Sequence, residues 1–291
     1  MCDDFTAAEE EAALARTGLN RRQFAAIGAA GVLAACSGGE GVAKAPGKLA
    51  ERSVAITTPD GTMDGFFVHP ARGRHPGVIL WPDIAGLRDA YKAMARRLAG
   101  AGYAVLVANH YYRSARAPVL DSIAAWRTPE GQARLKPMIA ALSAEGTTRD
   151  ATALVGWLDR QKAVDTRRGI GTQGYCMGGP YTVRTAAAVP ARVRAAASFH
   201  GGGLVSDQPN SPHRLLAATR ASFLIAIARN DDARAPADKD ALRAAASAAG
   251  RPAEIEVYQA DHGWCTLDAP VYDKAEAERA WARLLALYAG L

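Results

Sequence analysis

The sequence predicts an α/β fold with a mainly parallel, doubly wound sheet and helices on both of its faces. Short apolar runs, each long enough for one strand, alternate along the chain with longer segments of helical periodicity. Several of these runs are continuously apolar, which indicates strands that are buried on both faces. Strands that alternate with helices form parallel sheets. The 291 residues suit one such domain with a leader, and no internal repeat is visible.

The strand signals are apolar runs bounded by turn residues. A Pro-Asp-Gly turn at 59–61 predicts that the first two strands form an antiparallel hairpin at the sheet edge. The later runs predict buried strands. The expected strands cover residues 53–57, 63–69, 77–81, 104–108, 169–171, 193–199, 222–228 and 254–258.

Helix signals follow most of the later strands. Residues 89–101 place Tyr91 and Leu98 on one face and stop at Gly102. Residues 114–145 hold two further helical pieces, and we expect this insertion to cover a site at the carboxyl ends of the strands. The expected helices cover residues 89–101, 148–162, 180–188, 236–249 and 275–288.

Residues 171–179 read Gly-Thr-Gln-Gly-Tyr-Cys-Met-Gly-Gly, between a predicted strand and a predicted helix. This is the nucleophile-elbow pattern Gly-x-Ser-x-Gly, with Cys176 in place of serine. The turn strains the central residue, and a Cβ at Gly174 or Gly178 would collide with a neighbouring strand or helix. Cys176 would then lie at a helix N-terminus, which favours a thiolate. The alternative is a small packing cysteine beside glycines.

An acid and a histidine follow the elbow. Asp231 lies just after the run 222–228, and His262 lies in Ala-Asp-His-Gly-Trp. Nucleophile, acid and histidine is the chain order of the α/β-hydrolase triad. Asp232 is an adjacent candidate for the acid, and either carboxylate could instead belong to a turn or a helix cap.

These motifs resemble the dienelactone hydrolase family, which implies the α/β-hydrolase fold and a cofactor-free hydrolase of carboxylic esters or lactones. The resemblance covers roughly residues 52–290. It is carried by the elbow at 174–179, Phe-His-Gly-Gly at 199–202, Ala-Arg-Asn-Asp at 228–231, His-Gly-Trp at 262–264 and supporting segments at 81–87, 102–113 and 272–281.

We expect Cys176 to attack a carbonyl and form a thioester acyl-enzyme, with His262 transferring the proton and Asp231 holding the imidazole tautomer. The oxyanion hole of this fold uses the N–H after the nucleophile and one from the loop after an earlier strand. These positions correspond to Met177 and Ile84.

The resemblance also implies substrate contacts. Asp83 stands where the family usually carries a Glu that contacts the resting thiol, and its shorter side chain reaches less far. Arg113 matches an Arg that binds the substrate carboxylate, whereas the second such Arg is Thr266 here, which weakens the case for dienelactone itself. His200 follows a strand end and is expected to line the pocket. The alternatives are a loop-capping Asp83, a surface Arg113 and a structural His200.

The leader, residues 1–36, is predicted to be an export signal. Arg21 and Arg22 precede a short apolar run, as in twin-arginine signals, and that run is too short to span a bilayer comfortably. Leu-Ala-Ala-Cys at 33–36 resembles a lipobox, whose Cys36 would carry a lipid anchor, and residues 37–51 would form a flexible tether. The alternatives are an ordinary cleavage site and an amphipathic N-terminal helix. We expect an exported protein, periplasmic or membrane-anchored, with the hydrolase domain at 52–291.

Composition excludes several classes of function. The net charge of +6 comes largely from scattered Arg without interleaved aromatics, so nucleic-acid binding has little support. The four cysteines and six histidines lack the spacing of a metal site or disulfide framework, and we expect no metal or cofactor. Cys265 is expected to be a partly buried bystander or, alternatively, a second thiol at the site mouth.

Two functional alternatives stay open. The same residues could hydrolyse a thioester or peptide bond, since the fold does not separate acyl substrates. The other alternative is a non-catalytic surface lipoprotein that binds a ligand or partner. In either case a monomer is expected.

Overall fold

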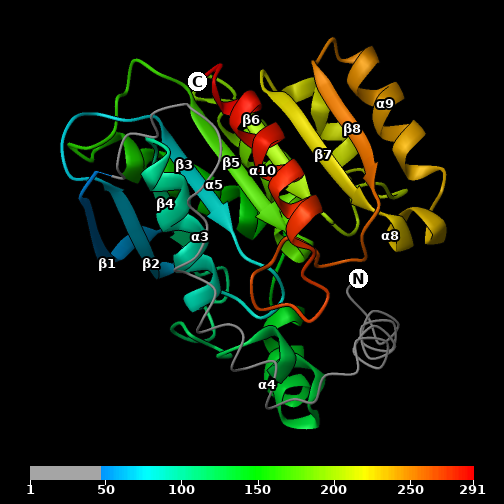
Figure 1. The fold of residues 1–291 in the computed structure, drawn as a ribbon, viewed down its shortest axis with the longest axis horizontal. Helices are drawn as coiled ribbons and strands as arrows, with labels where there is room; N and C mark the ends of the chain where they lie inside the picture. Colours follow the sequence, from blue (N-terminus) through cyan, green and yellow to red (C-terminus); the bar gives the residue numbers. More distant parts are fainter. Residues whose placement is uncertain (1–46) are drawn as a thin grey trace, which may run out of the picture.

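Eight strands form one sheet in the computed structural model, which describes residues 47–291 (Figure 1). The strand order is β1-β2-β4-β3-β5-β6-β7-β8. β1 pairs with β2 and β2 with β4 in antiparallel fashion, and every other neighbouring pair is parallel. This confirms the mainly parallel, doubly wound sheet. The predictions for residues 1–36, and for most of the tether, lie outside the described residues.

Most strands follow the predicted apolar runs because turn residues bound each run, whereas β5 continues to Tyr175, four residues past the predicted run 169–171. β3, β4, β6 and β7 begin and end where the sequence predicts. The hairpin is longer than predicted, since its register runs from Leu49↔Pro70 to Thr58↔Gly61. The strands are β1 Leu49–Thr58, β2 Gly61–Pro70, β3 Gly77–Trp81, β4 Ala104–Ala108, β5 Ile170–Tyr175, β6 Val193–Phe199, β7 Ser222–Ala228 and β8 Ala253–Tyr258.

Two helices, α7 and α8, are too short to show a helical periodicity in the sequence. α5 begins four residues earlier than predicted because the Ser143 hydroxyl accepts the Gly146 N–H and caps it. Within residues 47–291, no helix is long and apolar enough to cross a membrane. The helices are α3 Asp89–Gly100, α4 Pro129–Ala140, α5 Ala144–Asp159, α6 Gly179–Ala188, α7 Pro212–Leu215, α8 Arg229–Arg234, α9 Asp238–Ala248 and α10 Lys274–Tyr288, with 3-10 turns η1 Ile123–Arg127, η2 Cys176–Gly178 and η3 Leu216–Ala218.

Two apolar layers enclose the sheet. One cluster of buried side chains includes residues of α5, α6 and α9, among them Leu154 and Leu158 as predicted. The other includes residues of α3 and α10, among them Tyr91, Leu98 and Tyr288. α10 and α3 cross the near face of the sheet in Figure 1. Burial on both faces removes the strands from water and fixes the sheet as a rigid support for the loops at its ends.

The insertion between β4 and α5 contains the two expected helical pieces, η1 and α4. In Figure 1, α4 lies beyond the ends to which the parallel strands point. One apolar cluster contains the buried side chains of Ile84 and Ile123, and the partly buried Trp126 and Met177 pack against it. The insertion therefore packs against the loops that follow β3 and β5.

Candidate active site

The elbow has the backbone that the glycine pattern predicts. Cys176 directly follows β5 with a φ of 52°, in the left-handed region that non-glycine residues rarely adopt. A Cβ on Gly174 would lie 2.0 Å from the Gly178 carbonyl oxygen, and one on Gly178 would lie 2.4 Å from the Trp81 carbonyl oxygen. Both distances are shorter than real Cβ contacts, so only glycine at both positions allows this turn without a displacement of the backbone.

Cys176 begins η2, which leads into α6, so it lies at the start of a helical segment, where backbone N–H groups lack intrahelical partners. The residue is 5 % exposed. Cys176 is disulfide-bonded in the structure. It could therefore act as a thiolate nucleophile only after the disulfide has been reduced.

An acid–histidine pair joins α8, which directly follows β7, to the loop after β8. His262 Nδ1 lies 2.7 Å from Asp231 Oδ2, and the His262 N–H donates to Asn230 Oδ1 at 2.9 Å. Asp232 is bound instead by Lys239 Nζ, at 2.7 and 2.9 Å from its two carboxylate oxygens. The structure thus brings Asp231, rather than its neighbour, to the imidazole. The carboxylate binds Nδ1 of the imidazole, which is the ring nitrogen that the acid binds in a nucleophile–histidine–acid triad.

His200 packs against the imidazole of His262. The two ring centroids are 4.7 Å apart in an edge-to-face arrangement, and the backbone φ of His200 is 39°. Both His200 ring nitrogens are buried and form no hydrogen bond with any described residue. Burial and the neighbouring His262 lower the pKa of His200 well below its usual value. A neutral His200 therefore packs against His262, and its ring nitrogens are closed to solvent.

Ile84 occupies the middle of a tight turn after β3. The flanking N–H groups all donate: Asp83 to the Tyr91 hydroxyl at 3.1 Å, Ala85 to Asp83 Oδ1 at 2.9 Å, and Gly86 to the Asp83 carbonyl at 2.9 Å. The Ile84 N–H alone in this turn donates to no residue that the structure describes. It is therefore the donor of this turn that remains available to an oxyanion.

This turn adjoins the elbow. The Tyr111 hydroxyl lies 2.8 Å from the Ile84 carbonyl oxygen and 3.5 Å from Met177 Sδ. The carbonyl oxygens of Trp81 and Pro82 lie against Gly178 so closely that a Cβ there would meet them at 2.4 and 2.6 Å. The structure thus places the two predicted oxyanion residues side by side.

Asp83 is engaged in a buried ion pair that the sequence did not predict. Its oxygens accept from Arg88 Nη1 at 2.7 Å and Nη2 at 2.9 Å. Arg88 is 1 % exposed and also contacts Asp268, in the loop after His262, at 2.7 Å. Burial opposes the charge of Arg88, but the two carboxylates outweigh it and raise the pKa of Arg88 well above its usual value. Asp268 is 180 residues from Arg88, so no local pattern reveals the contact.

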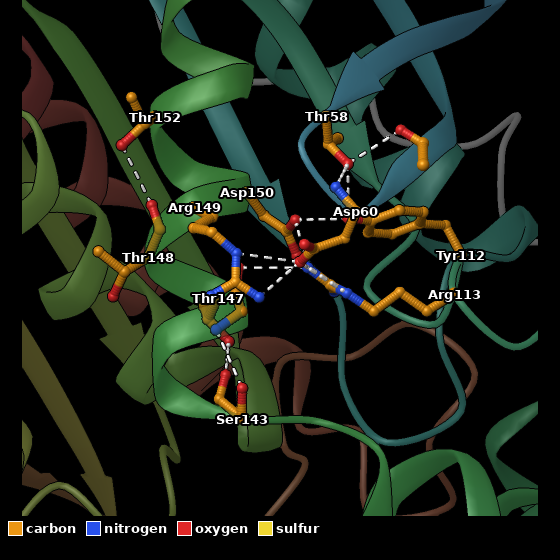
Figure 2. A network of polar contacts seen from close by, with 12 residues as sticks. Thr58, Asp60, Tyr112, Arg113, Ser143, Thr147, Thr148, Arg149, Asp150 and Thr152 are labelled. Carbon is orange, nitrogen blue, oxygen red and sulfur yellow. Dashed lines mark hydrogen bonds and ion pairs between the residues drawn. The ribbon is translucent and has the colours of Figure 1, made fainter.

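Arg113 belongs to a polar network at the other end of the insertion (Figure 2). Its guanidinium lies 2.6 Å from Asp60 Oδ2 and 2.8 Å from Asp150 Oδ1. Arg149 shares Asp60 at 2.7 Å, and the Tyr112 hydroxyl donates to Asp150 at 2.7 Å. The network connects the β1–β2 turn to the first turns of α5. Both of its carboxylates form ion pairs with the Arg113 guanidinium.

Two further residues that the sequence analysis considered, Cys265 and Thr266, are buried. Cys265 is a free, buried cysteine, and burial raises the pKa of its thiol well above the usual value. Thr266 is buried, and its hydroxyl forms no hydrogen bond with the described part of the chain. Residues 47–291 contain no group of three or more His, Cys, Asp or Glu side chains placed to hold a metal ion.

Comparison with known proteins gives one family. Residues 63–290 match the model of the dienelactone hydrolase family. A "Putative carboxymethylenebutenolidase" of Methylorubrum extorquens is 28% identical over 237 residues, 79% of this chain and 78% of its own. A protein of the same name from Escherichia coli K12 is 27% identical over 271 residues, with 84% and 93% covered. The crystal structure of a "Putative Dienelactone Hydrolase" from Klebsiella pneumoniae superposes with a TM-score of 0.73 at 24% identity, covering 84% of this chain and 100% of its own.

Proposed function

Because the chain belongs to the dienelactone hydrolase family, we propose that it cleaves a carboxylic ester or lactone with a Cys176–His262–Asp231 triad. The observation that carries this proposal is the 2.7 Å contact between His262 Nδ1 and Asp231 Oδ2. The pair follows β7 and β8, and the elbow, whose cysteine is held in a strained backbone conformation, follows β5 at the same edge of the parallel sheet. Such strain persists where the surrounding structure requires it, often in active sites.

The reaction proceeds in two halves on the reduced enzyme. His262 Nε2 takes the Cys176 thiol proton, and Sγ attacks the carbonyl carbon. The N–H groups of Ile84 and Met177 stabilise the oxyanion, while Asp231 stabilises the imidazolium. The C–O bond breaks, the leaving oxygen takes the proton from His262, and a thioester remains. His262 then activates a water molecule that hydrolyses the thioester and restores the thiol.

Two further proposals concern the whole protein. The twin arginine at 21–22 and the lipobox-like segment ending at Cys36 support export and acylation. Mass spectrometry of the mature N-terminus tests this, because acylation predicts a lipid-modified Cys36. A monomer remains our proposal for the assembly, and light scattering tests it.

The decisive experiment assays the full chain, kept reduced, against p-nitrophenyl acetate, a simple lactone and cis-dienelactone. We compare Cys176→Ala and His262→Ala with a matched control, Cys265→Ala, which removes a thiol outside the triad. We expect about a 10³-fold or greater loss of turnover in the first two variants, with control activity close to wild type. A thioester should be trapped on the peptide containing Cys176.

Two results would contradict the mechanism. Turnover that survives Cys176→Ala would show that another group performs the chemistry. Absence of turnover on the whole panel would favour the non-catalytic ligand-binding alternative. Faster turnover of a thioester or a peptide, assayed beside the panel, would instead support the other acyl-bond alternative.

A further inference from the structure

We infer that Arg88 is a positioning residue for catalysis: its buried guanidinium holds the turn that presents the Ile84 N–H to the oxyanion. The inference rests on the hydrolase mechanism proposed above. It assigns to Arg88 an effect on the transition state that it exerts through the backbone, without contact to the reacting atoms.

The Arg88 guanidinium forms hydrogen bonds with both ends of the turn, at Asp83 and at Gly86. Arg88 Nη1 donates to Asp83 Oδ1 at 2.7 Å and to the Gly86 carbonyl at 3.1 Å, and Nη2 donates to Asp83 Oδ2 at 2.9 Å. Ile84 lies between these two anchored residues. The same Asp83 oxygen that binds Nη1 also accepts the Ala85 N–H at 2.9 Å. A rotation of the Ile84 peptide would therefore break bonds to Arg88.

The same side chain joins the turn to two other segments around the site. Nε donates to Asp268 Oδ2 and Nη2 to Asp268 Oδ1, both at 2.7 Å. Asp268 Oδ2 also accepts the N–H of Ile123, at the start of η1, at 3.1 Å. These contacts use all five N–H donors of the guanidinium. Lysine, with one nitrogen, cannot reproduce this fork.

The surroundings suit a fixed geometry. The Arg88 guanidinium carbon lies 4.9 Å from the Tyr91 ring centroid, and the Tyr91 hydroxyl accepts the Asp83 N–H at 3.1 Å. A buried ion pair is weak support for stability, because desolvation offsets much of the attraction. The fork of fixed donors does, however, restrict the turn to one backbone conformation.

Loss of Arg88 should therefore affect the oxyanion more than the nucleophile. Removal of one oxyanion donor costs about 10²- to 10³-fold in kcat. His262 keeps its own anchors, Asn230 and Asp231, which both lie in α8. Alkylation of Cys176 by iodoacetamide forms no oxyanion, so its rate reports the nucleophile and His262 without the Ile84 donor.

The experiment uses the reduced, full-length protein and Arg88→Met. Because this variant leaves the buried Asp83 and the partly exposed Asp268 without their cation, a second variant combines Arg88→Met with Asp83→Asn and Asp268→Asn. The matched control is Arg97→Met, which removes a more exposed α3 arginine that pairs with Glu278. We measure the melting temperature, kcat and KM for p-nitrophenyl acetate, and the rate of Cys176 alkylation.

In the folded triple variant we expect kcat to fall about 100-fold, with KM and the alkylation rate each within about threefold of wild type. The control should match wild type in all three rates. A kcat within about threefold of wild type would overturn the inference, as would a parallel loss of kcat and alkylation, which marks a merely structural role. Wild-type protein without turnover would overturn the hydrolase proposal and this inference with it.

Discussion

The contact between the elbow and the end of β3 should respond sharply to one methyl group. Gly178 has a φ of −71°, which alanine adopts without strain, so Gly178→Ala tests the contact alone. Its new Cβ would lie 2.4 Å from the Trp81 carbonyl oxygen, whereas real Cβ atoms essentially never approach closer than 3.0 Å. The elbow and the strand end must therefore separate by at least about 0.6 Å, because backbone lies on both sides.

That displacement moves the Ile84 N–H relative to Cys176. A misplacement of about 1 Å can cost 10²-fold in rate, so we expect kcat to fall by about 10- to 100-fold with little change in KM. Overpacking at a backbone contact should also cost about 1–3 kcal/mol of unfolding free energy. Activity should thus fall under conditions in which the variant remains folded.

The assay is hydrolysis of p-nitrophenyl acetate, with urea unfolding of the same samples. The control is Gly156→Ala in α5, where the nearest atom to the new Cβ is Arg160 Nη1, at an ordinary 3.5 Å. It should raise the unfolding free energy by about 0.5–1 kcal/mol and leave kcat unchanged. A Gly178→Ala enzyme with kcat within about threefold of wild type would refute the reasoning.

Three further predictions concern the acid, a buried thiol and a buried imidazole. Asp231→Asn should lower kcat about 10⁴-fold by destabilising the catalytic His262 tautomer, whereas Asp232→Asn should stay within about twofold; equal losses would contradict the assignment. Burial raises the pKa of the Cys265 thiol, so peptide-resolved alkylation at pH 8 should leave it unmodified until the protein is denatured, and rapid native labelling would show exposure. Burial lowers the pKa of His110 from 6.5 to about 4, so the folded state disfavours its protonation. The contribution of neutral His110 to the unfolding free energy is intact above pH 6.5 and is lost as pH falls toward 4, with a loss of about 2 kcal/mol at pH 5. Urea titrations of His110→Leu should therefore show an unfolding free energy that depends less steeply on pH. The same pH dependence in His110→Leu and wild type would exclude the effect.

Local patterns were sufficient for the strands and the elbow. β3 and β7 match the predicted runs because a continuous apolar run bounded by turn residues has few other low-energy arrangements. The elbow glycines were predictable for a similar reason, since the collision at Gly174 involves Gly178, only four residues away. The start of α5 was missed because the Ser143 cap lies before the first apolar position of the helix.

The site required the fold itself. The sequence left Asp231 and Asp232 as alternatives, and only the meeting of α8 with the loop after β8 brings the former to His262, 31 residues away. The contact between His200 and His262, whose ring centroids are 4.7 Å apart, is an outcome of side-chain packing that no motif encodes.

By itself, the sequence determined the alternation of strands and helices, the strained cysteine turn and the chain order of the three candidate catalytic residues. The tertiary structure alone decided which charged groups pair: Arg88 with Asp83 and Asp268, and Arg113 with its two carboxylates. The physical reason is the separation along the chain over which each kind of interaction acts. Steric and turn rules act over a few residues, whereas ion pairs depend on which loops the order of strands in the sheet brings together.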